Sequence, residues 1–246
     1  MLRGIYSAAT GMITQTKKIN VLGNNIANVN TAGFKRDEIV LKSFDEELTT
    51  RLDDGTQVGS LSVGSSVGGV SVDFTQGPME QTNLATDLAI TGNGFFAVEA
   101  LPGSGGVKYT RDGNFQVDAQ GFLSLASGER LLSSDGNPLY TGGNGFAVSR
   151  DGKVNVSGKT LGNIALYIAQ DGTYAKRSDG FFNIATPMKA NGSIMQGYVE
   201  NSNVDAVDEM TGLMQAQRSF QSCQQAFQTA GQTLDKLINQ VGSLRG

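Results

Sequence analysis

The residues that most often carry out chemistry at neutral pH are nearly absent from this chain. It has 246 residues but no histidine and a single cysteine, Cys223. A Ser-His-Asp triad, almost every zinc site and a disulfide within the chain are therefore excluded. Catalysis would have to use carboxylates, lysines or hydroxyls, as in a glycosidase with two facing carboxylates. Acidic residues gather at 45–47 and 53–54, but they lack the spacing of a calcium-binding loop.

Two glycine-containing segments resemble nucleotide-binding loops only superficially. Residues 92–97 read GNGFFA, which fits G-x-G-x-x-A, but a dinucleotide loop must open a helix and this segment opens a strand-like run. Gly158-Lys159-Thr160 is similar to the end of a P-loop, yet Lys153 stands where the first glycine is required. We therefore predict no catalytic site, no cofactor, no metal and no enzymatic activity.

Charge and hydropathy exclude two further classes of partner. The net charge of −4 disfavours nucleic acid, because binding to phosphates depends on basic residues. The longest apolar stretch, residues 164–169, is far shorter than the roughly 20 residues that cross a membrane. The N-terminal segment lacks the small-residue cleavage site of a secretory signal. We expect no nucleic acid, no membrane insertion and no cleaved signal peptide.

The two ends of the chain carry helical patterns that would position any functional residues there. Both show the narrow heptad stripe of a coiled coil. The N-terminal stripe consists of Ile5, Ala8, Met12, Ile19, Leu22, Ile26 and Val29. The C-terminal stripe consists of Leu213, Ala216, Phe220, Cys223, Phe227, Ala230, Leu234, Leu237, Val241 and Leu244. We predict that the two helices pair as a coiled coil; an ordinary two-helix hairpin packed on a globular core is the alternative.

Local signals refine this picture of the helices. Ser202 or Asn203 could cap the start of the C-terminal helix. Glycines inside both patterns, such as Gly11 and Gly212, each weaken a helix by up to about 1 kcal/mol relative to alanine. The helices should therefore be ordered mainly by packing.

The middle of the chain is typical of antiparallel β-structure. Asp-Gly or Asn-Gly pairs, which suit tight turns, begin at Asp112, Asp135, Asp151, Asp171, Asp179 and Asn191. Strand-like runs lie at 95–99, 115–117, 146–149, 154–156 and 164–169. The predicted fold class is α+β, with a central antiparallel β domain that is small and barrel-like. We divide the chain into an N-terminal helix and asparagine-rich junction (1–35), an extended arm or linker (36–86), the β domain (87–199) and the C-terminal helix that pairs with 1–35 (200–246).

Asparagine is concentrated where the N-terminal helix should end. Residues 24–35 read NNIANVNTAGFK and contain Asn24, Asn25, Asn28 and Asn30, followed by Gly33 and Phe34. Asparagine favours turns and backbone capping over helix. The segment is either an ordinary helix end or a junction that contacts neighbouring chains.

This segment resembles the N-terminal signature of the flagellar rod and hook proteins, the axial family of the bacterial flagellum. Three further blocks are similar to that family in order and spacing: DLAITGNGFF at 87–96, YTRDGNFQVDAQGFL at 109–123 and QGYVENSNVDAVDEMTGLMQAQRSF at 196–220. The last includes Asn203 and the pair Gln217-Arg218. Gln221 and Gly231 depart from the residues common in relatives. A β region of about 100 residues leaves little room for the outer domain of hook proteins, so the chain resembles proximal or distal rod proteins.

The resemblance implies a structural subunit of the basal-body rod, the drive shaft between motor and hook. It implies helical assembly with copies of itself and with other rod and hook proteins, and export by the flagellar type III apparatus into the cell envelope without signal cleavage. A secreted oligomeric adhesin with a β recognition domain is the alternative from another class. The assembly interface that we predict comprises Ile5, Met12, Ile19, Leu22, Asn24, Asn25, Ile26, Asn28, Asn30, Gly33, Phe34, Asn203, Leu213, Gln217, Arg218, Phe220, Phe227, Leu234, Leu237 and Val241.

Overall fold

The structure is a computed structural model that describes residues 2–43, 47–50, 57–61, 64–100, 106–143, 145–156, 158–170, 172–177 and 180–243. The chain divides into two compact units. Unit 1 comprises Met1–Ala27, Asp37–Asp73 and Asp205–Gly246, and unit 2 comprises Asn28–Arg36 and Phe74–Val204. The expected α+β class with terminal helices and a central antiparallel sheet is confirmed.

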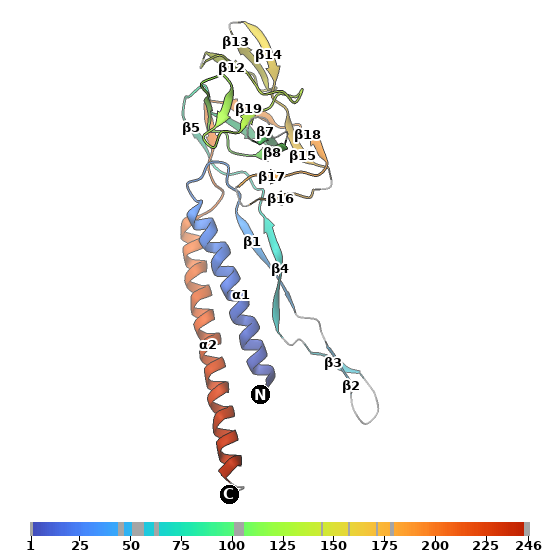
Figure 1. Cartoon of the computed structure of the whole chain (residues 1–246), viewed down its shortest axis with the longest axis vertical. Coiled ribbons are helices and arrows are strands. Elements are labelled where there is room, and N and C mark those ends of the chain that lie inside the picture. Colours follow the sequence, from blue (N-terminus) through green and yellow to red (C-terminus); the bar gives the residue numbers. More distant parts are fainter. Residues whose placement is uncertain are drawn as a thin grey trace. The chain divides into compact units, whose positions relative to one another are not determined.

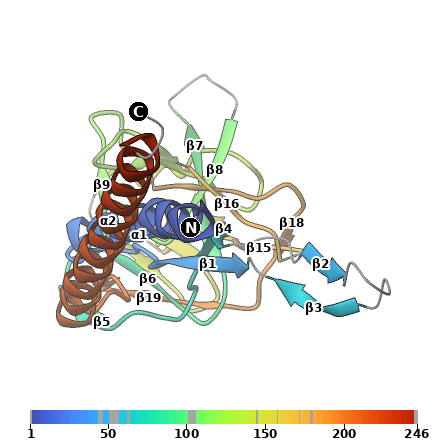
Figure 2. The same ribbon diagram turned by 90° about the horizontal axis from the view of Figure 1, so that it is seen from below.

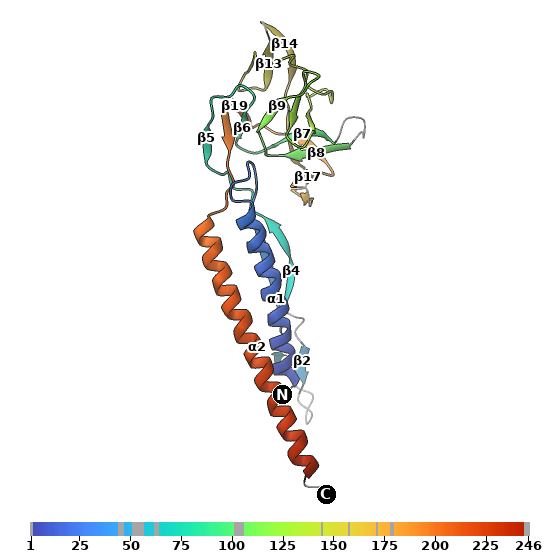
Figure 3. The same ribbon diagram turned by 60° about the vertical axis from the view of Figure 1, so that its left-hand side comes forward.

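Unit 1 contains both helices and two strand pairs. Helix α1 (Leu2–Ala27) and helix α2 (Ala206–Ser243) lie side by side (Figures 1 and 3). Strand β1 (Asp37–Ser43) pairs antiparallel with β4 (Ser65–Val72), and β2 (Glu47–Thr50) with β3 (Gln57–Leu61). Figure 2 shows α1 nearly end-on, with β1 and β4 beside it. Residues 36–86, which we described as an extended arm or linker, thus contain paired strands.

Small residues allow the two helices to approach each other closely. Ala8 and Ala216 are buried. A Cβ atom added to Gly11 would lie 3.1 Å from the Cys223 sulfur, and one added to Gly212 would lie 3.6 Å from Leu22. Gly11 therefore allows a closer approach than alanine would, whereas a methyl group at Gly212 would make an ordinary van der Waals contact.

The predicted stripe of α2 faces partly inward. Leu213, Phe220, Cys223 and Leu234 are half-buried, whereas Phe227 is exposed. Leu244 and the side chains of Leu237 and Val241 lie outside the described part of the chain. In α1, the predicted residues Ile5, Met12, Ile19, Leu22 and Ile26 are all half-buried.

The start of α2 corrects one local prediction. The Asp205 carboxylate accepts hydrogen bonds from the N–H groups of Val207 at 2.8 Å and Asp208 at 3.3 Å, so Asp205 is the N-cap. The expectation of Ser202 or Asn203 as the cap is wrong. Helix α2 begins at Ala206, directly after Asp205, and the Asn203 side chain is hydrogen-bonded to Arg36 and Thr75 instead.

Unit 2 is built from short antiparallel strands. They are β5 (Met79–Gln81), β6 (Leu88–Thr91), β7 (Phe95–Ala100), β8 (Gly106–Thr110), β9 (Phe115–Val117), β10 (Leu123–Leu125), β11 (Arg130–Leu131), β12 (Phe146–Val148), β13 (Lys153–Val156), β14 (Lys159–Asn163), β15 (Leu166–Ala169), β16 (Ala175–Lys176), β17 (Phe182–Asn183), β18 (Pro187–Lys189), β19 (Ser193–Gln196) and β20 (Tyr198–Glu200). The runs predicted at 95–99, 115–117, 146–149, 154–156 and 164–169 each overlap one of these strands, although β7 and β13 each extend one residue beyond the predicted run.

The main sheet of unit 2 is open. Its strands follow the order β16-β17-β8-β7-β11-β10-β9, and β15 pairs with β7 and β18. Smaller groups are β12-β13-β14, β19-β6 and β20-β5. Within the described residues no pairing joins β16 to β9, so the expected barrel is wrong. Short strands that end in separate two- and three-stranded sheets do not supply the continuous ladder that closure needs.

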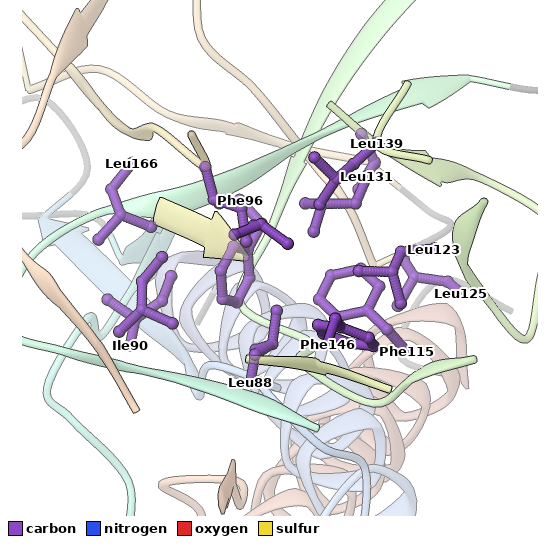
Figure 4. Packing of buried hydrophobic residues seen from close by; sticks show 14 of the residues in the cluster. Leu88, Ile90, Phe96, Phe115, Leu123, Leu125, Leu131, Leu139, Phe146 and Leu166 are labelled. Atoms are coloured by element: carbon purple, nitrogen blue, oxygen red, sulfur yellow. The ribbon is translucent and has the colours of Figure 1, made fainter. Parts of the chain in front are cut away.

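The core of unit 2 lies between these sheets. Leucine and phenylalanine side chains from β6, β7, β9, β10 and β11 meet there (Figure 4). Phe96 and Phe115 pack edge to face with ring centroids 5.4 Å apart. Leu88, Leu123 and Leu131 around them are fully buried. This cluster gives unit 2 its own hydrophobic core.

The Asp-Gly turns connect the strands largely as predicted. Gly152 has a φ of +85°, and a Cβ there would lie 2.3 Å from the Ile164 carbonyl oxygen, so only glycine fits without strain. Gly113 and Gly192 are exceptions that do not adopt positive φ.

One carboxylate on the hairpin between β10 and β11 is held in its charged form. The Lys108 ammonium lies 3.1 Å from the Glu129 carboxylate, which also accepts a hydrogen bond from the Ser127 hydroxyl. Burial raises the pKa of Glu129, but the hydrogen bonds from Ser127 and Lys108 outweigh that effect and hold the pKa below its ordinary value.

Candidate functional site

The first half of the asparagine-rich segment fastens the end of α1 within unit 1. The Asn25 side chain is fully buried. Its oxygen accepts the Asp37 N–H at 3.0 Å, and its nitrogen donates to the Asp37 carbonyl at 2.9 Å and to the Glu209 carboxylate at 3.2 Å. Only an amide side chain of this length offers a donor and an acceptor side by side. Asn25 thus ties α1 to the start of β1 and to the first turns of α2.

The second half of the segment is a tight turn within unit 2. The Phe34 N–H donates to the Thr31 carbonyl, and the Gly33 N–H donates to the Glu200 carbonyl at 2.7 Å. Gly33 has a φ of +67°, and a Cβ there would lie 2.3 Å from the Arg111 carbonyl carbon. The turn therefore requires glycine, both for its backbone conformation and for its contact with residues 111 and 112.

A buried ion cluster lies beneath this turn. We use "ion cluster" for Lys35, Arg111 and Glu200, which are 1%, 4% and 1% exposed. The Lys35 ammonium lies 2.6 Å from Glu200 Oε1, and Arg111 Nη1 lies 3.1 Å from Glu200 Oε2. Each carboxylate oxygen therefore has its own cation, and the three formal charges sum to +1.

Backbone groups add hydrogen bonds to the ion cluster, and among its described polar atoms Arg111 Nε is buried without a hydrogen-bond partner. The Gly77 N–H donates to Glu200 Oε1 at 3.0 Å, and Lys35 Nζ donates to the Thr75 carbonyl at 2.8 Å. Arg111 Nη2 donates to the Gly92 carbonyl at 2.8 Å. Buried charges are tolerated only when they are paired and hydrogen-bonded in this way.

Asn203 connects the same region to the rest of unit 2. Its side-chain oxygen accepts the Arg36 N–H at 2.8 Å, and its nitrogen donates to the Thr75 hydroxyl at 3.1 Å and the Thr75 carbonyl at 3.2 Å. These bonds hold the segment before α2 against the segment after the turn. The predicted interface residue Asn203 thus has a structural role within the chain.

Aromatic rings surround the turn and the ion cluster. The Lys176 ammonium lies 4.0 Å from the centre of the Phe34 ring and donates to the Lys35 carbonyl at 3.0 Å. The Arg111 guanidinium lies 5.3 Å from the Phe95 ring. Cations over aromatic faces add to the stability of such a site. Phe34 therefore anchors the turn within unit 2.

The contacts around the ion cluster are ion pairs, hydrogen bonds and cation–aromatic contacts within unit 2. Within the described residues no group of three or more His, Cys, Asp or Glu could hold a metal ion. In the part of the chain that the structure describes, no helix is long and apolar enough to cross a membrane.

Comparison with known proteins identifies the chain's relatives. Family models match three segments: "Flagella basal body rod protein" at residues 5–35, "Flagellar hook protein FlgE/F/G D1 domain" at 89–173 and "Flagellar basal body rod FlgEFG protein C-terminal" at 195–240. The flagellar basal-body rod protein FlgG of Bacillus subtilis is 33% identical, over 97% of this chain and 99% of the relative. The chain belongs to the flagellar basal-body rod protein family.

Other relatives agree with this assignment. The flagellar hook-basal body complex protein FlhO of Bacillus subtilis is 30% identical over 99% of the chain and all of the relative. The flagellar basal-body rod protein FlgF of Caulobacter vibrioides is 31% identical over 99% of this chain and 100% of the relative. The chain is a structural subunit of the flagellar basal body rod and localises there, and the adhesin alternative is not favoured. The family is one of structural proteins, not of enzymes.

The three family segments meet in the ion cluster. Residues 5–35 contribute Lys35, residues 89–173 contribute Arg111 and residues 195–240 contribute Glu200. Sequence reasoning quoted all three residues within signature blocks but gave none of them a role. Lys35 is the one charged residue of the block at 24–35, but the blocks at 109–123 and 196–220 each contain several, so no local signal distinguishes Arg111 or Glu200.

The remaining predicted interface residues are spread over both units. In unit 1, Asn24, Gln217 and Arg218 are exposed. In unit 2, Asn28 is half-buried, Asn30 is exposed, and Gly33 and Phe34 are buried. Asn25, Gly33, Phe34 and Asn203 are occupied by contacts within their own unit, whereas the exposed side chains present surface to solvent.

Proposed function

We propose that this rod subunit assembles helically with copies of itself and with other rod and hook proteins through its two terminal helices, which pair as a coiled coil. The observation that carries the proposal is a second apolar face on each helix of unit 1. Paired helices of a self-sufficient domain need only one apolar stripe.

The outward faces are formed by large apolar side chains at helical spacing. On α2, Val207, Met210 and Met214 are 72%, 51% and 53% exposed, and their i, i+3, i+7 spacing places them on one face. On α1, Tyr6 and Ile13 are 63% and 61% exposed. They are seven residues apart and therefore share one face of the helix, which is not the face that carries the half-buried stripe. Exposed apolar patches of this kind mark protein interaction sites.

The two outward faces differ in composition, which favours head-to-tail contact. A face on α1 of one copy that packs against a face on α2 of the next is a heterologous interface. Such interfaces repeat without closing when the rotation between copies does not complete a ring, and they then give helical filaments. The exposed residues Asn24, Gln217 and Arg218 of unit 1 would lie at the same interfaces, and Asn30 of unit 2 would contact a neighbouring subunit separately. We further propose export by the flagellar type III apparatus without signal cleavage, to a proximal or distal position in the rod.

The experiment replaces the outward face of α2. The double variant Met210→Glu/Met214→Glu should abolish swimming and incorporation into isolated basal bodies, because its charges would be buried between subunits. Circular dichroism of the purified variant should match that of the unaltered protein, since both positions are exposed in the single chain. Gln215→Glu, an exposed position on the same helix, is the control that should swim normally. Normal motility of the double variant would refute the proposed interface.

A further inference from the structure

Methionine occupies two solvent-exposed positions on the outward face of α2. Met210 and Met214 are 51% and 53% exposed. They are four residues apart, so their side chains are neighbours on the helix surface, whereas Leu213 is half-buried. The solvent-facing side of a helix usually carries charged or polar groups. The two thioether groups, which we call the methionine pair, are therefore accessible to small solutes in water.

The methionine pair is more exposed than the other methionines that the structure describes. Met188 on β18 is 46% exposed, and Met12, Met79 and Met195 are half-buried. A small oxidant in solution reacts fastest with the sulfur atoms that it can reach. The exposure of the side chains therefore ranks the methionine pair as the first methionines of the described chain to be oxidised.

We propose that the methionine pair is an oxidation site that decides whether this subunit can join the rod. The proposal rests on the assembly role that we give to the outward face of α2. In the reaction, hydrogen peroxide transfers one oxygen atom to each thioether sulfur, so that an S–O bond forms and the O–O bond of the peroxide breaks. The sulfur is oxidised by two electrons, and the peroxide is reduced, with its second oxygen leaving as water.

Oxidation changes the chemistry of the face and leaves the fold of the single chain intact. Methionine sulfoxide is polar, and its oxygen needs a hydrogen-bond partner when water is removed. Both side chains are in contact with water in the single chain, so the sulfoxides do not disturb the packing of unit 1. Between subunits, two sulfoxides without partners should weaken association at least about tenfold. A methionine sulfoxide reductase with a thiol reductant reverses this block.

The first measurement follows the oxidation of the purified full chain by dilute hydrogen peroxide. Peptide mass spectrometry gives the rate at which each methionine gains one oxygen atom. Met210 and Met214 should react severalfold faster than the half-buried methionines, because their sulfur atoms are more accessible. The circular dichroism of the chain should be unchanged when the methionine pair has reacted.

The second measurement tests assembly in bacteria that lack the gene and receive one of three versions of the chain. These are the unaltered chain, Met210→Leu/Met214→Leu and Met210→Gln/Met214→Gln. Basal bodies are isolated after new synthesis with and without hydrogen peroxide, and their content of the chain is measured. Peroxide should lower the content of the unaltered chain and leave that of the leucine variant unchanged, since leucine has no sulfur. The glutamine variant carries neutral amide oxygens on the same face and should enter poorly even without peroxide.

Two comparisons assign the effect to the methionine pair. Met188→Leu should remain as sensitive to peroxide as the unaltered chain, because Met188 lies in unit 2. Cys223 is half-buried, and a Cβ atom added to Gly11 would lie 3.1 Å from its sulfur. The leucine variant retains Cys223, so protection by leucine excludes the thiol as the cause.

Several results would overturn the proposal. They are equal entry of the unaltered chain with and without peroxide, equal loss of the unaltered chain and the leucine variant, normal entry of the glutamine variant, and reaction of the methionine pair no faster than that of the half-buried methionines. The Met210→Glu/Met214→Glu variant separates these results from the assembly proposal. If the glutamate variant is excluded from the rod while leucine gives no protection, the outward face of α2 acts in assembly but its oxidation does not control it.

Discussion

Substitution of Glu200 by glutamine should severely destabilise unit 2. The change preserves shape but removes the one negative charge of the ion cluster, so that Lys35 and Arg111 remain buried without a counter-charge. At an effective dielectric constant of about 20, the attraction across 2.6 Å is about 6 kcal/mol and that across 3.1 Å about 5 kcal/mol. Most of this gain offsets the desolvation of three charges, and removal of one partner from such a group typically costs about 3–5 kcal/mol.

Urea unfolding followed by tyrosine fluorescence measures this loss in the right part of the chain. The protein has no tryptophan, and all its tyrosines except Tyr6 lie in unit 2. We expect Glu200→Gln to lower the free energy of unfolding of unit 2 by about 3 kcal/mol or more. Glu80→Gln, an exposed glutamate on β5, is the control and should change it by no more than about 0.5 kcal/mol.

A double-mutant cycle distinguishes charge imbalance from simple loss of packing. Lys35→Met combined with Glu200→Gln should be less destabilising than the sum of the single changes, by about 1 kcal/mol or more, because the second change removes a buried charge that the first left unpaired. A loss of less than about 1 kcal/mol for Glu200→Gln, or strict additivity in the cycle, would refute the role that we assign to the ion cluster.

Four further changes test other parts of the structure. Gly33→Ala should lower the free energy of unfolding of unit 2 in urea by about 2 kcal/mol or more, because alanine there combines a positive φ with a clash against the backbone. Gly136 has a φ of +80° but open space around it, so Gly136→Ala should show only the cost of the positive φ. Equal effects of the two substitutions would contradict the reasoning. Asn25→Leu should accelerate amide exchange at the end of α1, since it leaves the polar groups of β1 and α2 without partners, and unchanged exchange would contradict this. Phe220→Asp should abolish motility while the tyrosine fluorescence of unit 2 stays native, and normal swimming would rule out the coiled-coil seam. Glu129 has a depressed pKa, so its stabilising contribution is fully present above its ordinary pKa and is lost as pH falls through the depressed pKa. The thermal unfolding midpoint of Glu129→Gln should therefore vary less between pH 3 and 6 than that of the unaltered protein. Parallel plots of midpoint against pH for the two proteins would contradict the depressed pKa of Glu129.

The elements of the fold could be predicted because they depend on local patterns. Heptad stripes identified both helices, and turn pairs such as Asp151-Gly152 delimited the strands of unit 2. Whether the sheet closes could not be predicted, because closure depends on which edge strands pair. The cap of α2 was misplaced for a similar reason: Asn203 has a better partner in Thr75, at a distance of 128 residues along the chain.

The ion cluster is the clearest case of a feature that one sequence cannot reveal. Lys35 and Arg111 are 165 and 89 residues away from Glu200, and nothing in the sequence says which of the charged residues is buried. The resemblance to rod proteins identified the three blocks that meet there. It did not identify the contact, because a signature records residue types and the physical pairing appears only in the folded chain.

The central claim, that the chain builds the basal-body rod, is tested most directly by electron cryomicroscopy of basal bodies isolated from bacteria that lack this gene. Our account predicts rods that stop short of their full length, with the missing part restored when the gene is returned. The point of truncation would also give the position of the subunit along the rod. Complete rods with hooks attached in the deletion strain would contradict the account.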